Sequence, residues 1–219
     1  MSTTITAATS AASQSDAAAF WERLWRLSGV NAVLFFIVAY FLTGAQPGVG
    51  ASADQIATFY AAGHIRILIA ATVAGMGVLN LMWFAAAIRT TLVEAGQDGW
   101  GGAVTAASAA VGGSFFALLA VPVALTSLAT GSGDHASLPV LNDLVWAGAV
   151  LTSFPRAMLI MAGSFGLWRA GIISQGVFAV CVVAVVLGVA GGTTWLGDGF
   201  WALDGAYTRF IWPGIGFAW

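Results

Sequence analysis

ILIAATVAGMGVLNLMWFAAAI, residues 67–88, decides the fold of this chain. The stretch contains no Asp, Glu, Lys or Arg, and a helix of about 20 apolar residues is long enough to cross the roughly 30 Å of hydrocarbon in a bilayer. Three further stretches are also free of charge, namely 27–53, 99–133 and 170–197. Because these stretches make up most of the chain, the sequence predicts an all-α, polytopic membrane helix bundle.

Composition agrees with a membrane location. Hydrophobic residues make up 59% of the chain and charged residues 7%, whereas soluble domains carry about 25% charged residues. A soluble protein of this size needs more charge to cover its surface, so we expect lipid around this one. With a formal net charge of −2, the chain has no electrostatic basis for binding nucleic acid.

Turn signals divide the chain into one transmembrane domain, 16–219, preceded by a polar tail, 1–15, that we expect to be disordered. A short amphipathic helix is predicted at 16–26. A second is predicted at 52–60, because Ser52 and Gln55 have the spacing of a capping box. Six transmembrane helices are predicted near 27–42, 65–88, 103–130, 141–167, 173–196 and 200–219.

The arginines predict the orientation of these spans. Arg23, Arg26, Arg89 and Arg169 lie on the N-terminal tail and on loops at one end of the bundle, and the opposite loops carry no Lys or Arg. By the positive-inside rule we expect both termini in the cytoplasm. Lysine is absent and Ala, Gly and Arg are plentiful, which is typical of a GC-rich bacterial genome, so we expect a bacterial plasma membrane. No basic residue follows the last span, so we expect the natural chain to continue beyond Trp219.

Three arginines lie inside apolar stretches, at positions 66, 156 and 209. Inserting a charge at the centre of a membrane helix costs about 2.5–3.5 kcal/mol, so the chain must gain something from keeping them. We expect an outward-facing pocket between the second, fourth and sixth spans, where guanidinium groups match a carboxylate or phosphate bidentately. The predicted ligand-binding residues are Arg66, Arg156, Arg209, Asp143, Asp204 and His64.

A structural role is the alternative for these charges. Arg66 and Arg209 could pair with Asp143 and Asp204 and so hold the bundle together, and both could extend their side chains to the membrane interface. Arg156 lies deeper, about 20 Å below Asp143 at 1.5 Å per residue. For Arg156 the alternatives are a ligand, a water cavity or a distant acid on one side, and satisfaction by backbone carbonyls on the other.

Motifs for catalysis or metal binding are missing from the sequence. His64 and His135 are the only histidines, and their spacing matches no metal-site signature. No GxSxG, HExxH, P-loop or CxxC motif is present. We therefore predict no catalytic residue, no metal and no cofactor.

Four segments carry a resemblance to a known group of proteins: ASADQIATFYAAGH (51–64), WFAAAIR (83–89), LWRAG (167–171) and FIWP (210–213). Together they resemble uncharacterised six-span membrane proteins of actinomycete-type bacteria, a domain of unknown function. The resemblance implies a six-span fold and a membrane location, and it implies no activity. In such proteins the last span usually continues to a basic tail, which this chain lacks.

These observations favour a non-enzymatic membrane protein with a pocket for a lipid or amphipathic anion, acting as a carrier, sensor or accessory protein. One alternative is a subunit or assembly partner of a larger membrane complex, or of a homo-oligomer, without a ligand of its own. A third hypothesis is an intramembrane enzyme acting on a lipid-like substrate, with His64 or Asp204 as general acid or base. For the hypothesis of a binding protein, the expected partner is membrane lipid.

Overall fold

A computed structural model describes Trp25 and residues 27–131, 135–211 and 213–215 of the chain. Within these residues the protein is helical and has no strand. The predicted tail 1–15 and almost all of the predicted helix 16–26 lie outside the described residues. The elements in chain order are Leu27–Thr43, α2 (Ala53–Ala62), α3 (His64–Glu94), α4 (Asp98–Thr130), η1 (His135–Ser137), α5 (Leu138–Leu151), α6 (Ser153–Arg169), α7 (Gln175–Gly191), η2 (Thr194–Leu196), η3 (Gly199–Trp201) and η4 (Tyr207–Ile211).

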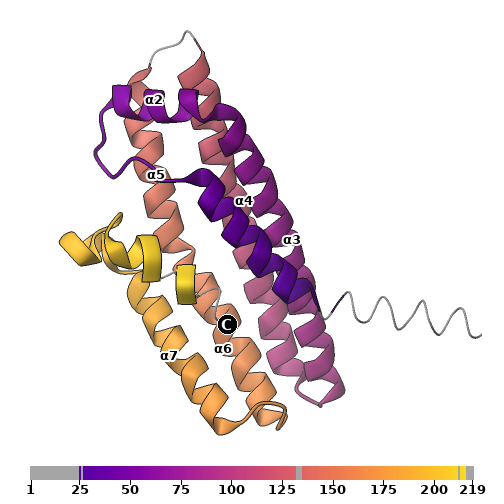
Figure 1. The fold of residues 1–219 in the computed structure, drawn as a ribbon. Coiled ribbons are helices and arrows are strands. Elements are labelled where there is room, and N and C mark those ends of the chain that lie inside the picture. Colours follow the sequence, from indigo (N-terminus) through magenta and orange to yellow (C-terminus); the bar gives the residue numbers. More distant parts are fainter. Residues whose placement is uncertain (1–24, 26, 132–134, 212, 216–219) are drawn as a thin grey trace, which may run out of the picture.

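Three helical units are long and apolar enough to cross a membrane: α3, α4 and the unit His135–Arg169. At 1.5 Å per residue, the 31 residues of α3 extend about 46 Å. Figure 1 shows α3 and α4 side by side along the length of the molecule, with α5 and α6 forming a third column. Leu27–Thr43 and α7 are shorter apolar helices. This architecture indicates a membrane protein.

Helix α2 lies across one end of the bundle (Figure 1) and buries Ile56 and Tyr60. Its start follows from the capping box that the sequence predicts. The Ser52 hydroxyl accepts a hydrogen bond from the Gln55 amide at 3.3 Å, and the Gln55 side chain accepts one from the Ser52 amide at 3.1 Å. The prediction of a short helix at 52–60 is therefore confirmed, with two further residues at its end.

The third column is one predicted span that the structure divides at Thr152, between α5 and α6. Pro155 explains the division, because its missing amide hydrogen and its ring are tolerated in the first turn of a helix but disrupt a helix interior. Pro155 is the third residue of α6, where that disturbance is small. Arg156 follows immediately and so lies just beyond the bend.

The region after α7 differs from the single helix predicted over 200–219. Its described part consists of short pieces, η3 and η4, separated by turns, and Figure 1 shows it turning across the molecule at mid-height. Gly199, with φ of +62°, and Gly205 lie in these turns. Glycine weakens helices by roughly 0.5–1 kcal/mol relative to alanine, and this stretch places several glycines among polar residues.

The core is divided into two packed clusters rather than one. The first joins α3, α4 and α6 near the α3–α4 turn, and the second lies under α2 at the opposite end. We call them the turn cluster and the α2 cluster. The turn cluster consists of Ala85, Ile88, Leu92, Val104, Ala107, Val111, Leu159 and Ala162, and the α2 cluster of Ile56, Tyr60, Ile67, Leu125, Ala129 and Leu138. The space between them holds the candidate site.

Candidate functional site

A cavity of about 560 Å³ occupies the middle of the bundle. Leu27–Thr43, α3, α4 and α5 form most of its wall, each with lining residues three or four apart, the spacing of one helix face. Helices α2 and α6 add one residue each, Tyr60 and Arg156. Along α3 the lining extends from Ile67 to Phe84, which is about 26 Å at 1.5 Å per residue. The helix Leu27–Thr43 contributes Gly29, Val30, Ala32, Val33, Phe36, Ala39, Tyr40 and Thr43 to the wall.

Small side chains explain why this space stays open. Alanine recurs on the cavity faces of three of the helices that line it, and its single methyl group leaves space there. The alanines that line the cavity are Ala32, Ala39, Ala70, Ala71, Ala74 and Ala149. A cavity of this size lies within the roughly 300–1,000 Å³ of typical ligand pockets.

Arg156 is the one charged residue among the described residues that line the cavity. Its guanidinium carbon lies 5.8 Å from the centre of the Phe115 ring, a cation–π distance that stabilises a cation in apolar surroundings. Phe36 contacts the same ring, with centroids 5.5 Å apart. The guanidinium group therefore lies among aromatic rings at mid-height of the bundle.

The end of the cavity nearest α2 is also polar. The side-chain amide of Gln46 donates a hydrogen bond to the Tyr60 hydroxyl at 3.0 Å, and both residues line the cavity. Tyr60 is only 1% exposed. Burial raises the pKa of Tyr60 to about 12, and the hydrogen bond from Gln46 opposes this rise. Tyr60 is therefore neutral, and a hydrogen-bond donor, throughout the physiological pH range.

A second hollow of about 410 Å³ adjoins the cavity, and the two share Tyr40, Thr43, Gln46 and Pro213 in their walls. Arg209 lines this second hollow. Its Nε donates to the Asp204 carbonyl at 2.5 Å and its Nη2 lies 3.4 Å from Asp204 Oδ2. These contacts fit the alternative in which Arg209 pairs with an acid and stabilises the bundle.

The predicted site carboxylates bind backbone rather than face the cavity. Asp204 Oδ2 accepts a hydrogen bond from the Val49 amide at 3.1 Å, and Asp143 Oδ1 accepts one from the Gly50 amide at 3.0 Å. Gly50 has φ of +71°, a conformation that favours glycine. The two acids thus fix the loop that leads from Leu27–Thr43 to α2.

Two residues of α5 hold the same loop. Asn142 Nδ2 donates to the Gly48 carbonyl at 2.9 Å, and Trp146 Nε1 donates to the Pro47 carbonyl at 2.8 Å. The Trp146 ring also lies under the Arg209 guanidinium, 4.7 Å from its centre to the carbon. The loop, α5 and the C-terminal segment are therefore joined by one polar network.

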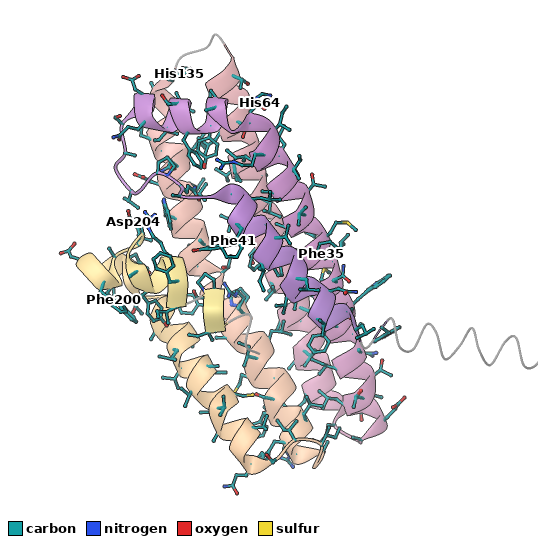
Figure 2. All side chains as sticks on the ribbon, viewed as in Figure 1. Phe35, Phe41, His64, His135, Phe200 and Asp204 are labelled. Carbon is teal, nitrogen blue, oxygen red and sulfur yellow. The ribbon has the colours of Figure 1, made fainter. Side chains whose placement is uncertain are left out.

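Arg66 and His64 lie apart from Arg156, on an open hollow near α2 lined by apolar residues such as Leu42 and Ile69. Both side chains are exposed. The Arg66 guanidinium carbon lies 5.7 Å from the centre of the Phe59 ring. Figure 2 shows His64 at the α2 end and Asp204 much closer to the middle of the molecule.

The six predicted residues thus occupy three different surroundings. Arg156 lines the central cavity, Arg209 and the acids belong to the loop network, and Arg66 with His64 lies on the separate hollow. The described part of the chain contains no group of three or more His, Cys, Asp and Glu residues placed to bind a metal ion.

Sequence reasoning missed two features of the cavity: the wall formed by Leu27–Thr43, and the polar pair of Gln46 and Tyr60. The wall had a signal, since small and aromatic residues recur at positions 29, 32, 36, 39 and 43 with helical spacing. The polar pair had no comparable signal, because the contact depends on the path of the loop.

Comparison of this chain with known protein families, with curated proteins and with solved structures finds no match.

Proposed function

We propose that this protein is a non-enzymatic bacterial membrane protein that binds a lipid-like, amphipathic anion in its central cavity. The acid group of the ligand contacts Arg156, and its apolar part fills the space between the two clusters. The observation that carries the proposal is the combination of an apolar cavity of about 560 Å³ with a single guanidinium group in its wall. A carrier, a sensor and an accessory protein all require such a site.

The size of the cavity argues for an occupant. A volume of about 560 Å³ is within the range of pockets that hold small molecules. Water fills cavities only where it finds two to four polar partners, and the described wall of this cavity is mostly apolar. An amphipathic molecule satisfies both the apolar wall and the arginine.

The charge of Arg156 selects an anion. A carboxylate or phosphate in the cavity is attracted to this cation because the surroundings screen the pair poorly. Guanidinium also offers two parallel donors to such a group. The ring of Phe115 supports the cation from one side.

We further propose that Leu27–Thr43 and α7 cross the membrane together with the three long units. The α3–α4 turn and the α6–α7 turn would face the cytoplasm, because Arg89 and Arg169 lie beside them and the loops at the α2 end carry no Lys or Arg. Both termini in the cytoplasm would require a sixth crossing within 200–219, which stays a prediction. Membership of the uncharacterised six-span family likewise rests on the four sequence segments.

The two alternatives have different support. A subunit of a larger complex is favoured by a row of exposed valines on α7, at positions 177, 180, 183 and 186, although lipid would cover such a row equally well. An intramembrane enzyme needs a general acid or base beside its substrate. No described residue of the cavity wall is Asp, Glu or His, so the geometry favours the binding protein.

Native mass spectrometry of the full chain, extracted gently from its own membranes, tests the proposal. We expect a retained acidic amphiphile, and we expect Arg156→Gln to lower its occupancy at least tenfold, since hydrogen bonds to charged groups contribute about 1.5–3 kcal/mol. Arg66→Gln is the matched control, because it removes an exposed arginine outside the cavity. Equal occupancy in both variants, or a bare wild-type chain, would contradict the proposal.

A further inference from the structure

The polar pair at the α2 end of the cavity has hydrogen-bonding capacity to spare. As placed, the Gln46 amide donates to the Tyr60 hydroxyl, so the hydroxyl acts as acceptor and its own proton needs another partner. Among the described residues, no acceptor lies within hydrogen-bonding distance of that proton. Tyr60 is almost completely buried, and an unsatisfied buried donor is costly.

Turning the side-chain amide of Gln46 around does not remove the spare donor. The oxygen and nitrogen of such an amide are assigned from their hydrogen bonds, and in the reversed orientation the oxygen would accept from Tyr60. The amide nitrogen of Gln46 would then be the donor that the pair presents. In either orientation, the pair places a hydrogen-bond donor in the wall of the cavity.

The distance between this pair and Arg156 follows from the helix Leu27–Thr43. Phe36 contacts the ring that supports the Arg156 guanidinium, and Thr43 lies at the end of the helix next to the loop that carries Gln46. Seven residues separate Phe36 from Thr43, which is about 10 Å along the helix axis at 1.5 Å per residue. Along this helix axis the two polar positions of the cavity are therefore separated by about 10 Å.

We infer that the ligand of this cavity is a two-ended amphiphile, with an acid group at Arg156 and a hydrogen-bond acceptor, such as a carbonyl or hydroxyl oxygen, at Tyr60 and Gln46. The inference rests on the proposed function and adds the second polar group to it. An extended chain advances roughly 1.1–1.2 Å per bond, since a residue of three backbone bonds spans at most about 3.3–3.6 Å. The acceptor should therefore lie about eight or nine bonds from the acid.

Three fatty acids of equal chain length test this inference: stearate, which has no ketone, 10-oxostearate and 5-oxostearate. The two keto acids differ only in the position of the ketone. The full chain is reconstituted in nanodiscs, and each acid competes with tritiated stearate. We expect 10-oxostearate to bind about threefold to tenfold more tightly than stearate, the factor that one net hydrogen bond contributes. The 5-oxo acid should have no such advantage, because its ketone lies too close to Arg156.

Two variants assign the advantage to the polar pair. In Tyr60→Phe/Gln46→Leu the ratio of the affinities for 10-oxostearate and stearate should fall to about one, because the second polar group is gone. Arg156→Gln should weaken all three acids. Should the double variant not fold, the ranking of the three acids by the wild-type chain still decides the question.

The failure of this inference differs from the failure of the proposed function. Equal affinities of the wild-type chain for stearate and 10-oxostearate would overturn the second polar group and leave the binding of an anion standing. A preference that survives in the double variant would also overturn it. If none of the three acids displaces the labelled stearate, both the inference and the proposed function are wrong.

Discussion

The turn cluster and the central cavity share α3, α4 and α6, yet one is packed and the other is hollow. In the turn cluster, a methyl group added at Gly166 would lie 2.8 Å from a Leu92 methyl carbon and 2.9 Å from the Trp100 β-carbon. In the cavity, alanines such as Ala71 and Ala74 line open space instead. Small residues on a helix therefore close a gap only where a large residue opposes them, and they open one elsewhere.

The largest effect should come from truncating the packed region. Leu92 is completely buried in the turn cluster, so we expect Leu92→Ala to lower the free energy of unfolding by about 2–5 kcal/mol. Leu118 borders the cavity and already lacks neighbours on one side, so Leu118→Ala should cost less than about half as much. Denaturant titration of both variants in micelles measures the difference, and equal losses would remove the distinction between the two regions.

A smaller effect is expected where the α2 cluster meets the cavity. Tyr60 has a pKa of about 12 in the folded protein and about 10 when unfolded. The folded state thus retains the phenol proton more strongly, and the stability that this provides is complete below pH 10. It is lost as the pH rises from 10 to 12, by about 2–3 kcal/mol.

Denaturant titrations of the wild-type chain and Tyr60→Phe across this pH range measure the loss, because the variant lacks the titrating group and shares all others. Between pH 10 and 12, the difference in unfolding free energy between the two proteins should change by about 2–3 kcal/mol. A constant gap would show that Tyr60 is not held in an apolar surrounding.

Gly166→Ala tests the packing of the turn cluster with a single added methyl group. The added carbon would press against Leu92 and Trp100, and overpacking a filled core costs about 1–3 kcal/mol. Gly113 in α4 is the matched control, because nothing described lies within 4 Å of an added carbon there. Gly113→Ala should be neutral or stabilising by up to about 1 kcal/mol, and thermal unfolding in micelles compares the two.

The smallest change in stability is expected from filling the cavity. Ala71→Leu adds three carbons where space is available, so the free energy of unfolding should change by less than about 1 kcal/mol, in contrast to the cost of crowding a packed core. The same variant should weaken the binding of stearate, since it occupies the site. A loss of stability as large as that of Gly166→Ala would mean that the cavity is not open.

The sequence carries the local features of this fold and few of its long-range contacts. Ser52 and Gln55 identify the start of α2 because a capping box is complete within four residues. The uncharged stretches 67–88 and 99–133 identify the long helices α3 and α4. The charge of Arg156 inside the predicted span 141–167 marks it as a residue that needs an explanation.

Other features depend on where distant segments meet. The partners of Asp143 and Asp204 are backbone amides of the loop near Gly50, and a sequence does not show which amides will lie near an acid. The contact of Gln46 with Tyr60 depends on the same loop. The short pieces after α7 differ from the predicted span because Gly199 and Gly205 favour turns over a continuous helix in an otherwise apolar stretch.

The hollow middle also gives this protein a characteristic response to hydrostatic pressure. Pressure favours whichever state eliminates internal voids, and a cavity of about 560 Å³ lies between two clusters that are themselves well packed. Compression should therefore act first on the packing of Leu27–Thr43 against α3, while the turn cluster stays intact. A molecule bound in the cavity would act as an incompressible filling, so occupancy and resistance to pressure should rise together.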